Sequence, residues 1–252
     1  MRLDDYRRHL ECALAEAHTD PALHARIVAR MSTALTSVER IADAEARTLE
    51  VLPAAERAGP EVQRDVLFAL SWARALRGQP VDDLCQRWVA ASAAPGFLAE
   101  SPERVAGQRS VWRGEINDAK AVFDRILELA DERGELASYF WARLHLCELA
   151  LRVGDWQAAQ RLLDEWAETS DRELFVEPYY QRCCALLAAG RGLPEDAIRW
   201  SDEAIAQAQA IDHQWDWLEG LRARGITALL TREPLRAAES LNAVWEHTSR
   251  EG

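Results

Sequence analysis

Three arginines recur at one register of this chain and could bind anions. Arg104, Arg182 and Arg222 each lie ten residues ahead of a short turn in which one helical pattern ends and another begins. A guanidinium group offers a planar fork of N–H donors that matches a carboxylate or a phosphate in two-point contact. These arginines therefore predict a clamp for an acidic group of a ligand or partner. The alternative is that they are ordinary solvated arginines or arginines paired within the chain.

The candidate binding residues are expected to share one helix face. Positions ten and six residues ahead of each turn are four apart, so their side chains lie one above the other on a helix. Tyr179 joins the face of Arg182, and Arg152 lies near it. The full candidate set is Phe68, Trp72, Arg104, Gln108, Glu148, Arg152, Tyr179, Arg182 and Arg222.

Patterns that carry catalysis or hold cofactors are missing from the sequence. Lys120 is the only lysine, and it lacks the preceding glycine loop that a phosphate-binding loop requires. The five cysteines include no Cys-x-x-Cys pair, and no Gly-x-Ser-x-Gly elbow is present. His145 and Glu148 can share a helix face, although a lone histidine there is more often a surface or core residue than a metal ligand. We therefore expect no enzymatic activity, no metal and no cofactor.

The elements that must position the candidate residues are paired helices that repeat along the chain. Five turns occur at Gly78, Gly114, Gly154, Gly192 and Arg232, in steps of 36, 40, 38 and 40 residues. In four of them a glycine can end one helix in a left-handed conformation. In all five, the residue two positions later, three times proline, can open the next helix. A helix–turn–helix unit repeated in this way predicts an all-α solenoid.

Hydrophobic periodicity predicts about thirteen helices. They span about 3–17, 21–35, 37–58, 61–77, 81–93, 102–113, 116–133, 135–153, 156–169, 178–190, 194–211, 214–231 and 234–248. Pro53 is expected to kink the third helix or end it early, because proline lacks the N–H that a helix interior needs. Residues 91–102 are expected to form an irregular connection in which Phe97 and Leu98 act as a hydrophobic plug.

Composition limits the class of protein. Hydrophobic residues make up 48% of the chain and charged residues 29%, which is typical of a protein that folds around a core. No apolar run approaches the roughly 20 residues that cross a bilayer, and the acidic start does not match a signal peptide, so we expect a cytoplasmic protein without membrane contact. The formal net charge of -12 opposes binding to nucleic-acid phosphates, and we expect none by this segment.

Small residues five positions after the start of each later turn complete a recognisable pattern. They are Ala119, Ala159, Ala197 and Ala237. Together with the stretch VGDWQAAQRLL at residues 153–163, this pattern resembles tetratricopeptide repeats (TPRs). The resemblance implies a right-handed superhelix in which the first helix of each hairpin lines a concave groove, so the candidate residues would line that groove. The steps exceed the usual length of about 34 residues, and Asp83 stands where the first hairpin should have its small residue.

A second resemblance is more specific. The stretches VWRGEINDAK at residues 111–120, LALRVGDW at 149–156 and REPLRAA at 232–238 resemble the helical-repeat region of the large ATP-binding transcriptional regulators of the LuxR family, the MalT-like kind. In that family the repeats lie between a P-loop ATPase and a DNA-binding helix-turn-helix, and they receive inducers or partner proteins. Neither flanking domain is present in this sequence, so the resemblance implies a segment of a larger regulator.

These observations lead to one expected function and one alternative. We expect residues 1–252 to form a single TPR-like helical-repeat domain that senses an effector or binds a protein or peptide within a transcriptional regulator. The alternative is a free-standing TPR adaptor that binds peptides or partner proteins in its concave groove. The oligomeric state is left open, with a homodimer as one alternative.

Overall fold

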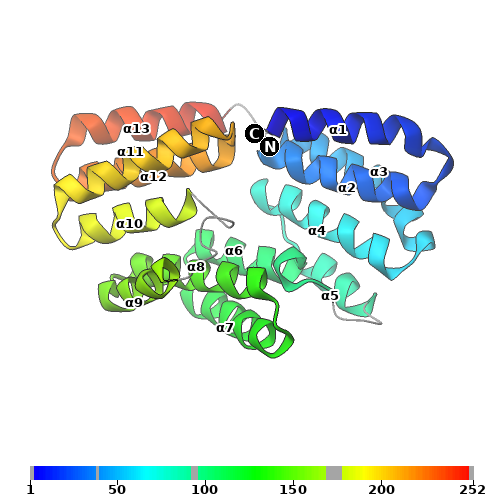
Figure 1. Ribbon diagram of the computed structural model, residues 1–252, viewed down its shortest axis with the longest axis horizontal. Helices are drawn as coiled ribbons and strands as arrows, with labels where there is room; N and C mark the ends of the chain where they lie inside the picture. Colours follow the sequence, from blue (N-terminus) through cyan, green and yellow to red (C-terminus); the bar gives the residue numbers. More distant parts are fainter. Residues whose placement is uncertain (1–2, 38–39, 92–95, 169–177, 250–252) are drawn as a thin grey trace. The chain divides into compact units, whose positions relative to one another are not determined.

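The computed structural model describes residues 3–37, 40–91, 96–168 and 178–249, and these contain helices and no strand. The chain divides into two compact units, Met1–Val122 and Phe123–Arg250, with the division inside one long helix (Figure 1). Unit 1 holds α1 (Leu3–Glu16), η1 (Ala17–Thr19), α2 (Pro21–Ser37), α3 (Ile41–Ala58), α4 (Pro60–Leu76), α5 (Asp82–Ala90), η2 (Leu98–Glu100), α6 (Pro102–Arg113) and the start of α7 (Ile116–Arg133). Unit 2 holds the rest of α7 together with α8 (Leu136–Val153), α9 (Trp156–Ala167), α10 (Tyr179–Gly190), α11 (Pro194–Ala210), α12 (Gln214–Leu230) and α13 (Pro234–Thr248).

The five predicted turns share one backbone geometry. At the end of α8, Gly154 has a φ of 76°, and Asp155 N donates to Ala150 O at 2.9 Å. This is the bond that closes a Schellman motif and satisfies a carbonyl at the end of a helix. The corresponding residues Gly78, Gly114, Gly192 and Arg232 also have φ between 63° and 76°, which confirms the predicted left-handed turns.

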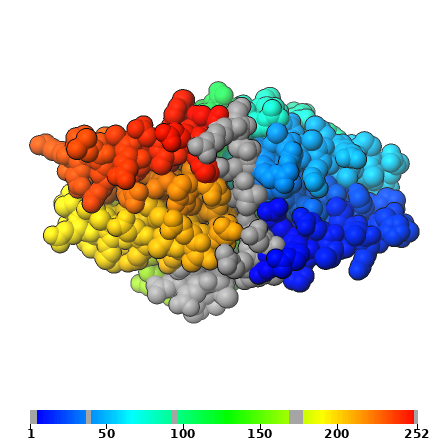
Figure 2. All heavy atoms as spheres, turned by 90° about the horizontal axis from the view of Figure 1, so that it is seen from above, coloured from blue at the N-terminus to red at the C-terminus, as the bar shows by residue number. Residues whose placement is uncertain are grey.

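Close helix packing follows from the small residues after the turns. Ala119, Ala159, Ala197 and Ala237 are at most 2% exposed. In unit 2, α8 packs on α9, α10 on α11 and α12 on α13, and α10 also contacts α8 and α12. Figure 2 shows the later helices of this unit as adjoining bands whose colours follow the chain. Consecutive packing of this kind is the arrangement of an α-solenoid.

Two local predictions are met in part. The helix α3 continues through Pro53 to its predicted end at Ala58 and does not end early, because Pro53 lies on an exposed face where water can satisfy the carbonyl that loses its partner; the kink expected as the other effect of Pro53 stays a prediction. In the irregular connection, Leu98 is 3% exposed and acts as the predicted plug, whereas Phe97 is 43% exposed and does not. Residues 92–95 of that connection lie outside the described residues.

None of the described helices combines the length and the apolar character needed to cross a bilayer.

Candidate functional site

The nine candidate residues fall into two groups, one in each unit. Phe68, Trp72, Arg104 and Gln108 lie in unit 1, on α4 and α6. Glu148, Arg152, Tyr179, Arg182 and Arg222 lie in unit 2, on α8, α10 and α12. The three arginines of the predicted clamp are therefore divided between the units, with Arg104 in unit 1.

Arg104 is held by aromatic rings and by the backbone. Its guanidinium carbon lies 5.8 Å from the centre of the Phe68 ring and 5.2 Å from that of Trp72. Its Nε donates to Ala99 O at 2.5 Å, and Trp72 continues the group toward Trp112 with ring centres 6.3 Å apart. We call Phe68, Trp72, Arg104 and Trp112 the aromatic–arginine cluster. Within it, the Arg104 guanidinium makes cation–π contacts with two rings and donates to a backbone carbonyl.

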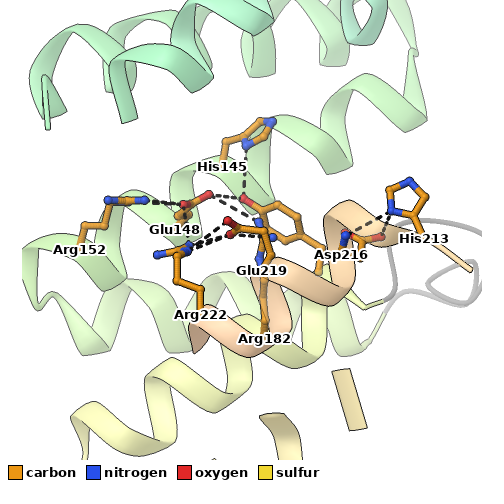
Figure 3. Close-up of polar contacts among 9 residues, drawn as sticks. His145, Glu148, Arg152, Arg182, His213, Asp216, Glu219 and Arg222 are labelled. Carbon is orange, nitrogen blue, oxygen red and sulfur yellow. Dashed lines mark hydrogen bonds and ion pairs between the residues drawn. The ribbon is translucent and has the colours of Figure 1, made fainter. Parts of the chain in front are cut away.

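Glu148 on α8 is the centre of the group in unit 2 (Figure 3). Its side chain is only 5% exposed. Arg152, one helical turn further on, donates from Nη2 to Glu148 Oε1 at 3.1 Å. The Tyr179 hydroxyl on α10 donates to Glu148 Oε2 at 2.6 Å, and Arg182 Nη2 lies 3.8 Å from the same oxygen.

A second carboxylate, Glu219 on α12, completes the group. Arg222 binds it with two nitrogens, with Nη2 at 2.7 Å from Glu219 Oε2 and Nε at 3.2 Å. Arg182 Nη1 reaches Glu219 Oε2 at 3.0 Å, so Arg182 on α10 bridges the carboxylates of α8 and α12. Arg222 Nη2 also lies 3.7 Å from Glu148 Oε1. We call Glu148, Arg152, Tyr179, Arg182, Glu219 and Arg222 the ion cluster.

Neighbouring charges keep both carboxylates of the ion cluster ionised. Burial by itself would raise the pKa of Glu148, but Arg182, Arg222, Arg152 and the Tyr179 hydroxyl outweigh it and lower that pKa to about 2. The pKa of Glu219 is also lowered, because Arg222 and Arg182 outweigh its burial. Burial and the nearby Glu148 raise the pKa of Tyr179 well above its ordinary value, so its hydroxyl remains a neutral donor.

His145 supports the ion cluster from the same helix. It is 2% exposed, stacks on Phe123 with ring centres 4.4 Å apart, and places Nδ1 3.3 Å from the Tyr179 hydroxyl. Of the two positions expected for His145, surface or core, the structure shows the core. Among the residues that the structure describes, no three histidine, cysteine or acidic side chains converge as metal ligands would.

Most of the candidate side chains pack inside their units. Phe68, Arg104, Gln108, Glu148, Tyr179 and Arg182 are each at most 7% exposed. In the ion cluster only Arg152 and Arg222 reach solvent appreciably, with side chains 30% and 26% exposed. The alternative of arginines paired within the chain therefore describes Arg182 and Arg222.

One member of the ion cluster was missing from the sequence-based candidates. Glu219 lies three residues before Arg222 on α12, a spacing at which an acid and a base can pair on one helix. That spacing is the signal that would have found it. Its contact with Arg182, across two helices, depends on the packing of α10 against α12.

Comparison with known proteins adds no assignment. No protein-family model matches the chain, and no curated protein matches its sequence. What the ion cluster can do follows from its chemistry: its guanidinium groups can bind anions, and a change in their pairing can alter the packing of the three helices that carry them.

Proposed function

We propose that this chain is a non-catalytic helical-repeat module, a TPR-like right-handed superhelix, that senses an effector or partner protein within a MalT-like transcriptional regulator of the LuxR family. One observation supports a sensing role above all others. The ion cluster joins α8, α10 and α12, which are the first helices of three consecutive hairpins.

Such a cluster can connect binding to a change of packing. Arg182 touches a carboxylate on the hairpin before it and another on the hairpin after it, at 3.8 and 3.0 Å. A ligand that takes over one of these contacts changes the balance of forces between neighbouring hairpins. A solenoid transmits such a change along its axis, because each repeat contacts chiefly its neighbours. The ATPase and DNA-binding domains of such a regulator would receive it.

The experiment that tests this proposal examines the protein in its source cells. An antibody raised against this chain should detect a polypeptide several-fold larger than 28.4 kDa. Relative to wild-type cells, cells whose polypeptide carries Arg182→Ala should show altered transcript levels for a set of genes. The same genes should be altered in cells that lack the polypeptide altogether. A band at 28.4 kDa with unchanged transcripts would contradict the regulator and favour the free-standing adaptor.

A further inference from the structure

We infer that the solvent edge of the ion cluster, formed by Arg152 and Arg222, is a binding site for one carboxylate group. This inference rests on the proposed function, since it names the chemical class that the sensing site would recognise. It starts from the charges of the cluster. Three arginines face two glutamates there, and Tyr179 is neutral, so the cluster carries one positive charge in excess.

The excess charge lies within a chain of opposite overall sign. The formal net charge of the protein is -12, whereas this site has a surplus of arginine, buried at Arg182 and reaching solvent at Arg152 and Arg222. Repulsion is present within it, because Arg182 lowers the pKa of Arg222 even though Glu219 and Glu148 raise that pKa overall. Arg182 is buried, and a charge withdrawn from water without full pairing costs free energy. A third anion would remove that cost.

The unused donors mark where the third anion would bind. Arg152 points Nε and Nη2 at Glu148 Oε1, at 3.4 and 3.1 Å, and Arg222 places Nη2 3.7 Å from the same oxygen. Two guanidinium groups thus converge on one carboxylate oxygen. Within the described part of the chain, the hydrogen bonds of Arg152 and Arg222 come from Nε and Nη2 and none from Nη1, and both side chains reach solvent.

A buried donor deeper in the site also supports the binding of an added carboxylate. Arg182 is 4% exposed, and its Nη1 makes no hydrogen bond among the described residues, although Glu219 Oε2 lies 3.0 Å away. The contact with Glu219 is therefore an ion pair without hydrogen-bond alignment. If an added carboxylate shared Arg222, Glu219 would be free to turn fully toward Arg182. Binding at the edge would then improve the pairing of the buried arginine.

The size of the excess positive charge and the planar shape of the guanidinium groups favour a carboxylate over a phosphate. One carboxylate carries the single negative charge that balances the cluster, whereas a phosphate monoester carries about 1.5 to 2 charges and would exceed it. A carboxylate is also planar and matches the guanidinium fork in two-point contact. Its source is either an aspartate or glutamate side chain of a partner protein or a free carboxylic acid.

Calorimetric titration of the full chain with defined probes tests the inference. The probes are acetylated tetraglutamate amide, succinate, inorganic phosphate and, as a neutral peptide, acetylated tetraglutamine amide. At least one carboxylate probe should bind, and Arg152→Ala with Arg222→Ala should weaken it by about tenfold or more. Arg199→Ala is the matched control, because Arg199 is an exposed arginine of unit 2 that pairs with Asp196 and Glu203 on its own helix.

Arg152→Lys gives a second test, whose outcome does not depend on whether the variant with both arginines replaced by alanine folds. It keeps the charge and removes the planar fork, so carboxylate affinity should fall several-fold. Binding of the peptide alone would identify a partner side chain as the source, and binding of succinate alone would identify a free acid.

Several results would overturn the carboxylate site. These are no carboxylate binding by the wild-type chain, equal affinity in the substituted chains, or tighter binding of phosphate. None of these results would contradict the proposed function, which is tested separately by the size of the native polypeptide and by transcript levels in cells.

Discussion

The two units place different chemistry at the same register of their helices. In unit 1, the positions ten and six residues before a turn hold Phe68 with Trp72 and Arg104 with Gln108. Arg104 there meets two aromatic rings and the Ala99 carbonyl. In unit 2, arginines of the same register meet ionised glutamates.

This difference determines what each unit can respond to. The contacts of Arg104 include rings and a backbone carbonyl whose positions are fixed by the fold. The arginines of the ion cluster are paired with side-chain carboxylates, and a carboxylate from outside can compete for them. On the inference of a carboxylate site, we therefore expect the response to a ligand in unit 2.

The largest contrast is expected when one buried polar group is replaced by leucine in each unit. Glu148→Leu leaves Arg182 with a single ion-pair partner in the protein interior and should lower the free energy of unfolding by about 3–5 kcal/mol. Gln108→Leu removes a buried Oε1 that has no hydrogen-bond partner among the described residues, and its effect should stay within about 1 kcal/mol. Urea unfolding followed by circular dichroism measures both. Equal effects of the two substitutions would remove the distinction between the units.

Acid should weaken unit 2 through the same carboxylate. The pKa of Glu148 is lowered from 4.5 to about 2 in the folded chain, so its ionised form stabilises the fold above pH 4.5 and this contribution is lost as the pH falls toward 2. The difference corresponds to about 3 kcal/mol. Glu148→Gln should remove this part of the pH dependence. Hydrogen exchange at pH 3 should increase in α8, α10 and α12 before α2 and α4, and the opposite order would contradict the assignment.

Most of the fold was predictable because it depends on local signals. The turn glycines, the alanines after them and the helix-opening prolines act over a few residues, and helix boundaries such as 116–133 and 234–248 follow from them. The sequence left two effects of Pro53 open, a kink or an early end, because the effect depends on which face of α3 is exposed, and that is decided by tertiary packing.

The site was predictable only as a set of residue types. The register grouped Arg182 with Arg222, but it also grouped them with Arg104, which belongs to the other unit. Spacing along one helix fixes which side chains share a face, whereas the pairing of Arg182 with Glu148 and Glu219 depends on the distances between three helices. The sequence alone does not determine those distances.

Two glycines beside tryptophan rings provide a comparison that does not involve charge. A Cβ on Gly190 in unit 2 would lie 2.5–2.7 Å from three atoms of the Trp156 ring, and Gly190→Ala should cost about 1–3 kcal/mol by overpacking. A Cβ on Gly96 in unit 1 would lie 2.8 Å from one atom of Trp88, with the flexible Arg64 as its other neighbour. Gly96→Ala should cost less than Gly190→Ala. Thermal unfolding measures both, and the reverse order would show that Trp88 is the more rigidly packed ring.

The smallest effects on stability are expected at two helix N-caps. Salt should change the cost of removing one of these caps and not the other. Ser101 in unit 1 is buried, and its Oγ accepts from Arg104 N at 3.2 Å and donates to Leu98 O at 2.8 Å. Asp155 in unit 2 is exposed and accepts from Ala158 N at 2.9 Å. Each change to alanine should cost about 0.5–2 kcal/mol, and Ser101→Ala the more, since it also leaves a carbonyl without its donor.

The charge of Asp155 interacts with the helix dipole, and this attraction is screened by salt, whereas the neutral Ser101 cap is not. In 1 M NaCl the cost of Asp155→Ala should therefore fall, while that of Ser101→Ala should stay constant. Urea unfolding at low and high salt measures both costs. If the cost of Ser101→Ala instead depended on salt, that cost would arise from the charge of Arg104. The aromatic–arginine cluster would then be stabilised by charge–charge interactions, as the ion cluster is.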